Sequence, residues 1–314
     1  MNQLVQDGSE QSLQQPSLQQ PSRHESHARD DEHLVRLWLH GKSENTQEAY
    51  LRDVEQFVQL IDRPLRRVTL QDLQDWDDFL RERYADSTRK RKLATLKSLF
   101  SFGQKIGYFT FNVGAAVSTP TVKDRLAERI LSETEVQRIL AMEDDLRNGV
   151  LLRIFYASGG RVSELTGLEW RSVQERTDRS QRAGQVTLFG KGDKTRTILL
   201  SPESWKALEK LRAHEQNEGY GRPSDPVFRS QKGGALSRVQ MWRIVKKAAR
   251  RVGIDLDEKP VSPHWFRHAH ASHALDRGAP THLVKETLGH ESLQTTSKYA
   301  HARPDDSSSR YLNV

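Results

Sequence analysis

Apolar residues recur at helical spacing along the first third of the chain. The stretches HLVRLWLHG (33–41), TQEAYLRDVEQFVQLI (46–61), TLQDLQDWDDFLRERY (69–84) and STRKRKLATLKSLFSFGQKIG (87–107) each place apolar positions three or four residues apart. In the last of them, Leu93, Leu96, Leu99 and Phe100 form one apolar stripe. This spacing is typical of amphipathic helices, so the region predicts a module of four helices.

A second patterned region begins near residue 130 and is more varied. LSETEVQRIL (131–140) opens with a capping-box pair, Ser132 and Glu135, and NGVLLRIFYASGG (148–160) predicts a buried helix ended by two glycines. QVTLFGKGDKTRTILL (185–200) has two β-prone runs around a glycine-rich turn, which predicts a hairpin. SRVQMWRIVKKAARRVG (237–253) and SPHWFRHAHASHAL (262–275) predict further helices. The expected fold class is mainly α with a small antiparallel β-sheet (α+β).

Changes in composition divide the chain into segments. Residues 1–28 contain the tandem repeat SLQQPSLQQPS, which cannot bury enough apolar surface to fold, so we expect a disordered Gln/Pro/Ser-rich tail. We expect a helical domain over residues 29–115 and a second domain over residues 131–303. Residues 113–130 carry Gly, Pro and mixed charge, and within this stretch we expect a linker over residues 116–130. Residues 304–314 form a short polar tail.

The positive charge is concentrated in the later part of the chain. Residues 1–120 hold 16 Lys and Arg against 17 Asp and Glu, a net charge of −1, whereas residues 121–314 hold 33 against 25, a net charge of +8. The pI of the whole sequence is about 9.5. A basic domain favours polyanionic partners, because each phosphate it neutralises releases bound counterions.

Other features of the composition exclude several classes of protein. The sequence has no cysteine, so disulfides, thiolate metal sites and cysteine nucleophiles are excluded. The absence of cysteine also suits a protein of a reducing compartment. No apolar run approaches the ~18 residues of a membrane span, and the polar N-terminus has no signal-peptide core. We therefore expect a cytoplasmic protein with no membrane partner.

Four histidines and one arginine lie in SPHWFRHAHASHAL (262–275). Ser262 and Pro263 suit the start of a helix, which places His264 and Arg267 on one face of its first turn. A helix N-terminus beside a cation attracts anions, so this placement favours phosphate over a metal ion. The His264/His268 pair lacks the glutamate of an HExxH zinc motif, and we expect no metal site. The remaining histidines, His270 and His273, are interpreted as packed or hydrogen-bonded.

Three further stretches contain residues suited to phosphate chemistry. Arg161 in SGGRVSELTGLEW follows two glycines, and its guanidinium could bind phosphate oxygens or pair with Glu164 or Glu169 on the surface. Lys191 lies between two glycines in the hairpin turn, where it could reach a bound group or have no role. In ETLGHESLQTTSKYAHA, His290 follows a helix-ending glycine, and Tyr299 lies on a short helix. His290 could be a capping residue or a reactive group, and Tyr299 could be a half-buried aromatic or a reactive group.

Two basic helix faces are candidates for contact with a nucleic-acid backbone. One lies in the fourth helix of the N-terminal module and the other in the 237–253 helix. A basic face can also be merely solvated, but its attachment to a basic domain favours DNA contact. The candidate residues are Arg89, Lys90, Arg91, Lys92, Lys97, Arg243, Lys246 and Lys247.

The order of these stretches resembles the tyrosine recombinase (phage integrase) family across residues 130–303. The resemblance rests on the R-x-S-E-L context of Arg161, the G-K-G turn, H-x-x-R, L-G-H, and a tyrosine nine residues after that histidine. Phe266 stands where the family usually has Leu, an exchange of one apolar residue for another. Residues 30–112 resemble the helical core-binding (SAM-like) DNA-binding domain of that family by layout. The candidate catalytic residues are Arg161, Lys191, His264, Arg267, His290 and Tyr299.

The resemblance implies a site-specific DNA recombinase that forms a 3′-phosphotyrosine intermediate without metal, ATP or other cofactor. Arg161 and Arg267 would clamp the phosphate, Lys191 would protonate the leaving 5′-oxygen, and His264 would share the Tyr299 proton or bind phosphate. It also implies a homo-tetramer on two duplexes, a Holliday junction, activity at the nucleoid and possible use of an accessory DNA-bending protein. The alternatives are a type IB topoisomerase and a non-catalytic DNA-binding protein.

Overall fold

The computed structural model describes residues 27–122, 126–176, 183–190, 195–254 and 261–300. The chain forms two compact units, Met1–Lys123 and Asp124–Val314. This division falls inside the segment 116–130 that the sequence assigns to a linker. The tails 1–28 and 304–314 lie almost entirely outside the described residues.

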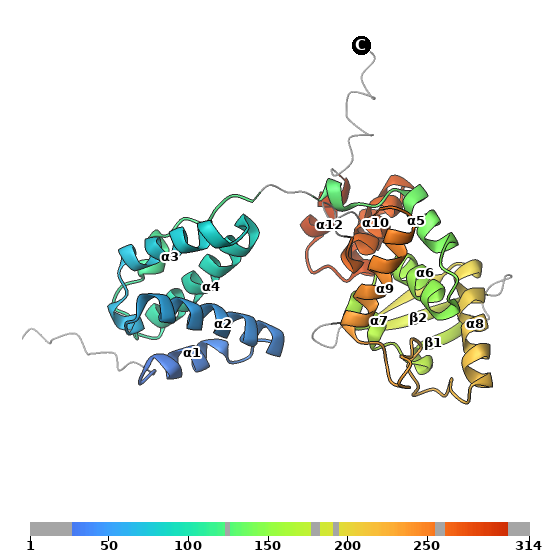
Figure 1. The fold of residues 1–314 in the computed structure, drawn as a ribbon, viewed down its shortest axis with the longest axis horizontal. Coiled ribbons are helices and arrows are strands. Elements are labelled where there is room, and N and C mark those ends of the chain that lie inside the picture. Colours follow the sequence, from blue (N-terminus) through green and yellow to red (C-terminus); the bar gives the residue numbers. More distant parts are fainter. Residues whose placement is uncertain (1–26, 123–125, 177–182, 191–194, 255–260, 301–314) are drawn as a thin grey trace, which may run out of the picture. The chain divides into compact units, whose positions relative to one another are not determined.

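The N-terminal unit is helical, as the sequence predicts (Figure 1). Two of its helices begin with side-chain caps: Asp30 accepts from the backbone of His33, and Thr69 forms a capping box with Asp72. The apolar stripe of the fourth helix is buried, and Trp76 packs edge-on against Phe57 in the same core. The helices are α1 (Asp31–Leu39), α2 (Glu44–Ile61), α3 (Leu70–Arg83) and α4 (Asp86–Lys105).

The C-terminal unit contains a three-stranded antiparallel sheet in the order β1-β2-β3. The predicted hairpin is confirmed as β2 (Ala183–Phe189) and β3 (Thr195–Leu200), with Val186 opposite Ile198. The sequence analysis missed the edge strand β1 (Val173–Arg176), which is too short to show an alternating pattern. It also made no prediction for α8 (Pro202–Asn217), which packs on the sheet and on α6 (Figure 1).

Helices cover the sheet and complete the C-terminal unit (Figure 1). The predicted capping box of Ser132 and Glu135 is confirmed. Ser262 occupies the N-cap position ahead of Pro263, although its side chain forms no capping hydrogen bond. The other helices are α5 (Glu133–Ala141), α6 (Leu146–Ser158), α7 (Val162–Thr166), α9 (Arg238–Arg251), α10 (Pro263–Asp276), α11 (Thr281–Leu288) and α12 (Leu293–Ala300).

The α10 helix is central to this unit, since it contacts α6, α11 and α12. Phe266, on its inner face, is fully buried and meets Phe155 of α6 edge-on. Sequence segments more than 100 residues apart are thereby held together. Within the described part of the chain, no helix combines the length and the apolar character that crossing a bilayer requires.

Candidate active site

The backbone turn between α6 and α7 presents Arg161 to the rest of the site. Gly159 ends α6 in the left-handed conformation with φ of 56°. A Cβ at this position would lie 2.6 Å from Leu288 and 2.8 Å from the ring of His270, so only glycine fits between α10 and α11. Arg161 then takes the N-cap position of α7. The two glycines therefore serve close packing of the turn.

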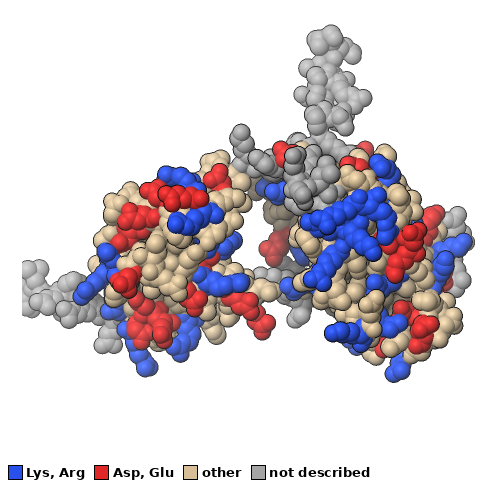
Figure 2. Space-filling view, viewed as in Figure 1, with Lys and Arg blue, Asp and Glu red and all other residues tan. Residues whose placement is uncertain are grey.

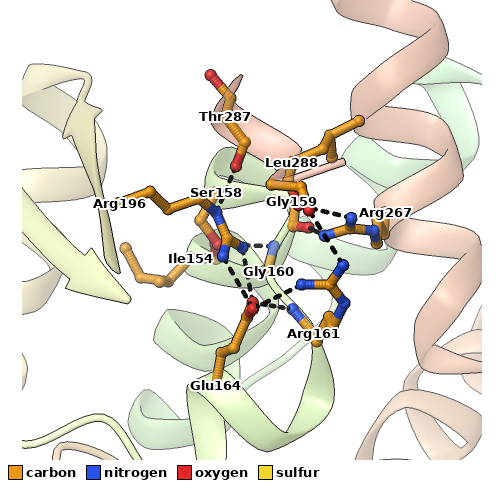
Figure 3. A network of polar contacts seen from close by, with 11 residues as sticks. Ile154, Ser158, Gly159, Gly160, Arg161, Glu164, Arg196, Arg267, Thr287 and Leu288 are labelled. Carbon is orange, nitrogen blue, oxygen red and sulfur yellow. Dashed lines mark hydrogen bonds and ion pairs between the residues drawn. The ribbon is translucent and has the colours of Figure 1, made fainter. Parts of the chain in front are cut away.

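Glu164 is a buried carboxylate that binds two arginines (Figure 3). Its Oε2 accepts from the backbone N–H of Arg161 at 2.7 Å, and its Oε1 accepts from the Arg161 guanidinium at 3.0 Å. Arg196 of β3 binds the same carboxylate with both Nη atoms, at 2.8 and 2.6 Å. Sequence analysis allowed for a surface pair of Arg161 with Glu164. The pair exists, but its carboxylate is only 5% exposed.

Three arginines bind three successive carbonyl groups at the C-terminal end of α11. Arg196 donates to Thr287 O at 2.6 Å, Arg267 donates to Leu288 O at 2.7 Å, and Arg161 donates to Gly289 O at 3.3 Å. Figure 3 shows the first two of these bonds beside the buried carboxylate. The last carbonyls of a helix lack partners within it and carry partial negative charge, so cations stabilise them.

This arrangement concentrates positive charge in a buried place. Arg267 is 5% exposed and also donates to Gly159 O at 2.6 Å. Burial and the neighbouring guanidinium groups of Arg161 and Arg196 lower the pKa of Arg267 to about 10, so it stays charged at neutral pH. Burial raises the pKa of Glu164, but hydrogen bonds from Arg196 and Arg161 outweigh it and hold that pKa below its usual range. Glu164 pairs with Arg161 and Arg196, whereas Arg267 is bound to carbonyl groups, so the site keeps an excess of positive charge that attracts an anion.

The Tyr299 side chain is 6% exposed and lies among histidines. Its hydroxyl is 2.8 Å from Nδ1 of His268, and the two ring centroids are 5.6 Å apart. The His290 ring lies parallel to the tyrosine ring at 6.2 Å. His264 is one helical turn before His268, with 6.4 Å between their ring centroids. The hydroxyl thus has His268 as a hydrogen-bond partner, and His268 is not among the six predicted catalytic residues.

Two of these histidines favour the neutral form. Burial and the charges of Arg267 and Arg161 lower the pKa of His264, and burial and the same arginines lower that of His290 to about 4. His290 is fixed by a 2.8 Å hydrogen bond between its Nδ1 and Thr296, a fully buried residue of α12. His290 therefore links the end of α11 to the helix that carries Tyr299.

The other two histidines of α10 have structural partners. His270 Nδ1 lies 2.8 Å from the Tyr156 carbonyl, and His273 Nδ1 lies 2.8 Å from the Tyr156 hydroxyl. Their interpretation as hydrogen-bonded packing residues is confirmed. Among the residues that the structure describes, no group of three His, Asp or Glu side chains is arranged to hold a metal ion.

Five of the six predicted catalytic residues lie in the part of the chain that the structure describes: Arg161, His264, Arg267, His290 and Tyr299. Helices α10, α11 and α12 contact one another, and Arg161 reaches the end of α11 through its hydrogen bond to Gly289 O. Lys191 lies outside the described residues.

The basic face of α4 differs from its prediction. Arg89 binds Asp77 through two hydrogen bonds of 2.6 and 2.7 Å, and Arg91 and Lys92 both bind the buried carboxylate of Asp53. Lys92 is only 7% exposed and its ammonium donates to Asp53, which disfavours it as a surface contact with DNA. The helical pattern of α4 does not reveal this burial, because the partner carboxylate of Asp53 lies 39 residues away in the sequence.

The remaining basic candidates have different surroundings. Lys90 is exposed, and Lys97 donates to the Val117 carbonyl. On α9, Arg243 and Lys247 are exposed, and the Lys246 ammonium lies 4.9 Å from the centroid of the Trp242 ring. Figure 2 shows Lys and Arg side chains gathered on the C-terminal unit.

Arg196 is the residue of the arginine network that sequence analysis missed. It precedes Ile198 and Leu200 in β3 by two and four residues, so it shares their inward face. A strand period of two could have found it as a charge on the core side. The signal for His268 was weaker, because helical spacing places it near His264 but cannot show which ring meets Tyr299.

Family models match both units. The description "Phage integrase family" fits residues 129–305, and "Phage integrase, N-terminal SAM-like domain" fits residues 31–105. The chain is 35% identical over 284 residues to the tyrosine recombinase XerD of Pseudomonas aeruginosa, which covers 86% of this chain and 91% of that protein.

Solved structures share the fold. A lambda integrase (75–356) dimer bound to a COC′ core site superposes with a TM-score of 0.70 and 18% identity, covering 88% of this chain and 95% of that one. A lambda integrase tetramer bound to a Holliday junction superposes with a TM-score of 0.70 and 18% identity, covering 88% of this chain and 77% of that one.

Proposed function

Because this chain belongs to the phage integrase family, whose members are site-specific tyrosine recombinases, we propose that the site around Arg161, Arg267 and Tyr299 cleaves and rejoins DNA strands. The observation that carries this assignment is the meeting of two guanidinium groups and a buried phenol at one place. Phosphoryl transfer requires a positively charged clamp and a nucleophile, and these residues supply both.

The arginines neutralise the phosphate in this proposal. A phosphodiester gains charge on its nonbridging oxygens as the nucleophile approaches, and a guanidinium binds two such oxygens in one plane. Arg161 and Arg267 are held by carbonyl groups and a carboxylate, so their positions are set before the substrate arrives. Such preorganisation lowers the barrier, because no reorganisation is needed during the reaction. His264, at the first turn of α10, and His290 add hydrogen bonds to the same phosphate.

Tyr299 is the nucleophile. Its Oη–H bond breaks, the oxygen attacks the phosphorus, and the P–O5′ bond breaks, which leaves a 3′-phosphotyrosine and a free 5′-hydroxyl. Lys191 supplies the proton to the departing 5′-oxygen. The phosphotyrosine conserves the energy of the phosphodiester, so a 5′-hydroxyl from a partner strand reverses the step. The cycle uses neither metal nor ATP.

We further propose that the reaction takes place in an assembly on DNA. Strand exchange between two duplexes requires four active sites used in pairs, so four copies of this chain would hold two recombination sites and a Holliday junction between them. Lys90, Arg243, Lys246 and Lys247 would contact the DNA backbone. We place the protein at the nucleoid, with an accessory DNA-bending protein as a further partner at some sites.

A type IB topoisomerase is the second candidate function, because it would use the same clamp and tyrosine. The test has two stages. Covalent adducts trapped in the native genome are sequenced to find the preferred site, and a plasmid with two copies of that site is then incubated with the protein. We expect recombined products that depend on the paired sites. Relaxation of any supercoiled plasmid, without exchange of partners, would instead identify a topoisomerase.

A further inference from the structure

We propose that His268 is the general base that takes the proton from the Tyr299 hydroxyl. This inference rests on the proposed function, in which Tyr299 is the nucleophile, and it adds a residue to the six selected from the sequence. The observation is geometric: Nδ1 of His268 lies 2.8 Å from the phenolic oxygen, in hydrogen-bonding distance of the atom that must lose a proton.

The chemistry of the nucleophile creates the need for a base. A phenol has a pKa near 10, so it is protonated at neutral pH and is a weak nucleophile. Histidine titrates close to neutral pH and is the side chain most often used for this task. The Tyr299 side chain is buried, so bulk water has little access to its hydroxyl. A base must therefore come from the protein.

The groups around His268 favour it over the other histidines. His264 sits in the first turn of α10, where the helix N-terminus and Arg267 suit an anion, which assigns it to the phosphate. His290 has its Nδ1 committed to Thr296, which leaves that nitrogen unable to serve Tyr299. Among the described residues, the ring centroid of His264 lies 6.4 Å from that of His268, and Arg267 directly precedes His268 in α10.

The helix geometry holds the imidazole in this position. His268 directly follows Arg267, whose guanidinium is fixed to two carbonyl groups, and it lies on the α10 face that packs against α12. In the proposed step the Oη–H bond of Tyr299 breaks and the proton moves to Nδ1, which makes an imidazolium. When a 5′-hydroxyl reseals the strand, its proton passes back to Lys191, the P–O5′ bond forms and the P–O bond to tyrosine breaks, and the imidazolium proton returns to the phenolic oxygen.

Two substitutions separate proton transfer from mere positioning. His268→Asn keeps an oxygen near the place of Nδ1, which accepts a hydrogen bond but cannot take the proton, whereas His268→Ala removes both functions. His282→Asn is the matched control, since His282 is an exposed histidine on the adjacent helix α11. The measurement is the single-turnover rate of covalent adduct formation on a nicked suicide duplex carrying the trapped site, from pH 6 to pH 10.

If His268 is the base, both variants bind the duplex like the parent but form the adduct at least ~100-fold more slowly at pH 7. The rate of the Asn variant then rises about tenfold per pH unit, because the phenol must ionise without help. Added imidazole accelerates the Ala variant. The control keeps the rate and pH profile of the parent. Should the Asn variant fail to bind DNA, His268→Gln takes its place with the same expectations.

Three results would overturn the inference. A rate for His268→Asn within about threefold of the parent would leave His268 a positioning role only. A faster rate would show that His268 restrains Tyr299 in a resting state. An unchanged pH profile in both variants would assign the proton to another group. Tyr299→Phe is tested in parallel: an adduct that persists in that variant would refute the proposed nucleophile, which is a separate failure.

Discussion

Arg196 holds both carboxylate oxygens of Glu164, with one Nη 2.8 Å from Oε1 and the other 2.6 Å from Oε2. Arg196 belongs to β3 and Glu164 to α7, so the pair joins the hairpin to the turn that carries Arg161. The hairpin turn also contains Lys191. One buried ion pair therefore links the sheet to the phosphate clamp, and its loss should affect both stability and cleavage.

We expect Glu164→Gln to destabilise the C-terminal unit by roughly 3–5 kcal/mol, because it leaves buried arginines without their counter-charge. The matched control is Glu133→Gln, which removes the carboxylate partner of Arg277 in an exposed ion pair that is also bidentate. That change should cost less than ~1 kcal/mol. Denaturant unfolding of the two variants measures the difference. Equal losses of stability in both would contradict a structural role for the buried pair.

Arg161→Lys and Arg267→Lys each keep the charge but lose the planar fork. We expect DNA affinity close to that of the parent and adduct formation slower by about 100- to 1000-fold, the usual effect of one strong transition-state contact. Arg171→Lys, at an exposed position, is the control and should leave the rate unchanged. If either active-site variant cleaves within a few-fold of the parent, that arginine has no catalytic role.

Stability should fall between pH 6.5 and pH 4 because of His270. Burial lowers the pKa of His270 to about 4, whereas an unfolded histidine titrates near 6.5. The unfolded chain thus binds more protons in this window, and the stabilisation present above pH 6.5 is lost as the pH falls. The loss is up to ~3 kcal/mol by pH 4. His270→Asn keeps a donor for the Tyr156 carbonyl and should flatten the dependence seen in denaturant unfolding; an identical slope would exclude His270 as its source.

The role of Lys191 as general acid can be tested with a substrate whose leaving group needs no proton. A duplex with sulfur at the bridging 5′ position releases a thiolate, which needs no proton. This substrate should restore cleavage to Lys191→Ala but not to Arg267→Ala, because the arginine stabilises the phosphate in both substrates. Equal rescue of the two variants, or of neither, would point to a different general acid.

Local patterns in the sequence were sufficient for the four N-terminal helices, the hairpin and most helices of the C-terminal unit, although not for α8. The stripe through Leu93 and Phe100 and the cap at Ser132 each depend on residues within one turn or two, so periodicity reveals them. β1 was not predicted, because its four residues are too few for an alternating pattern that would distinguish a strand from a loop. The motif order around Arg161 and Tyr299 then identified the site through resemblance.

Contacts between distant segments could not be predicted in the same way. Lys92 lies on a basic helix, yet it is buried against Asp53, 39 residues away. Similarly, Arg196 donates to the Thr287 carbonyl of α11, and His268 lies in hydrogen-bonding distance of the Tyr299 hydroxyl. Each depends on how helices rotate and pack against each other, which the linear spacing of one helix does not determine.

The central claim is that Tyr299 forms the covalent bond to DNA, and peptide mapping of the trapped adduct tests it most directly. A nicked suicide duplex is incubated with the protein in EDTA, the adduct is digested, and mass spectrometry locates the nucleotide. We expect it on Tyr299, and we expect Tyr299→Phe to bind DNA without forming an adduct. A nucleotide on Tyr311 or Tyr156, or an adduct that EDTA abolishes, would contradict the mechanism.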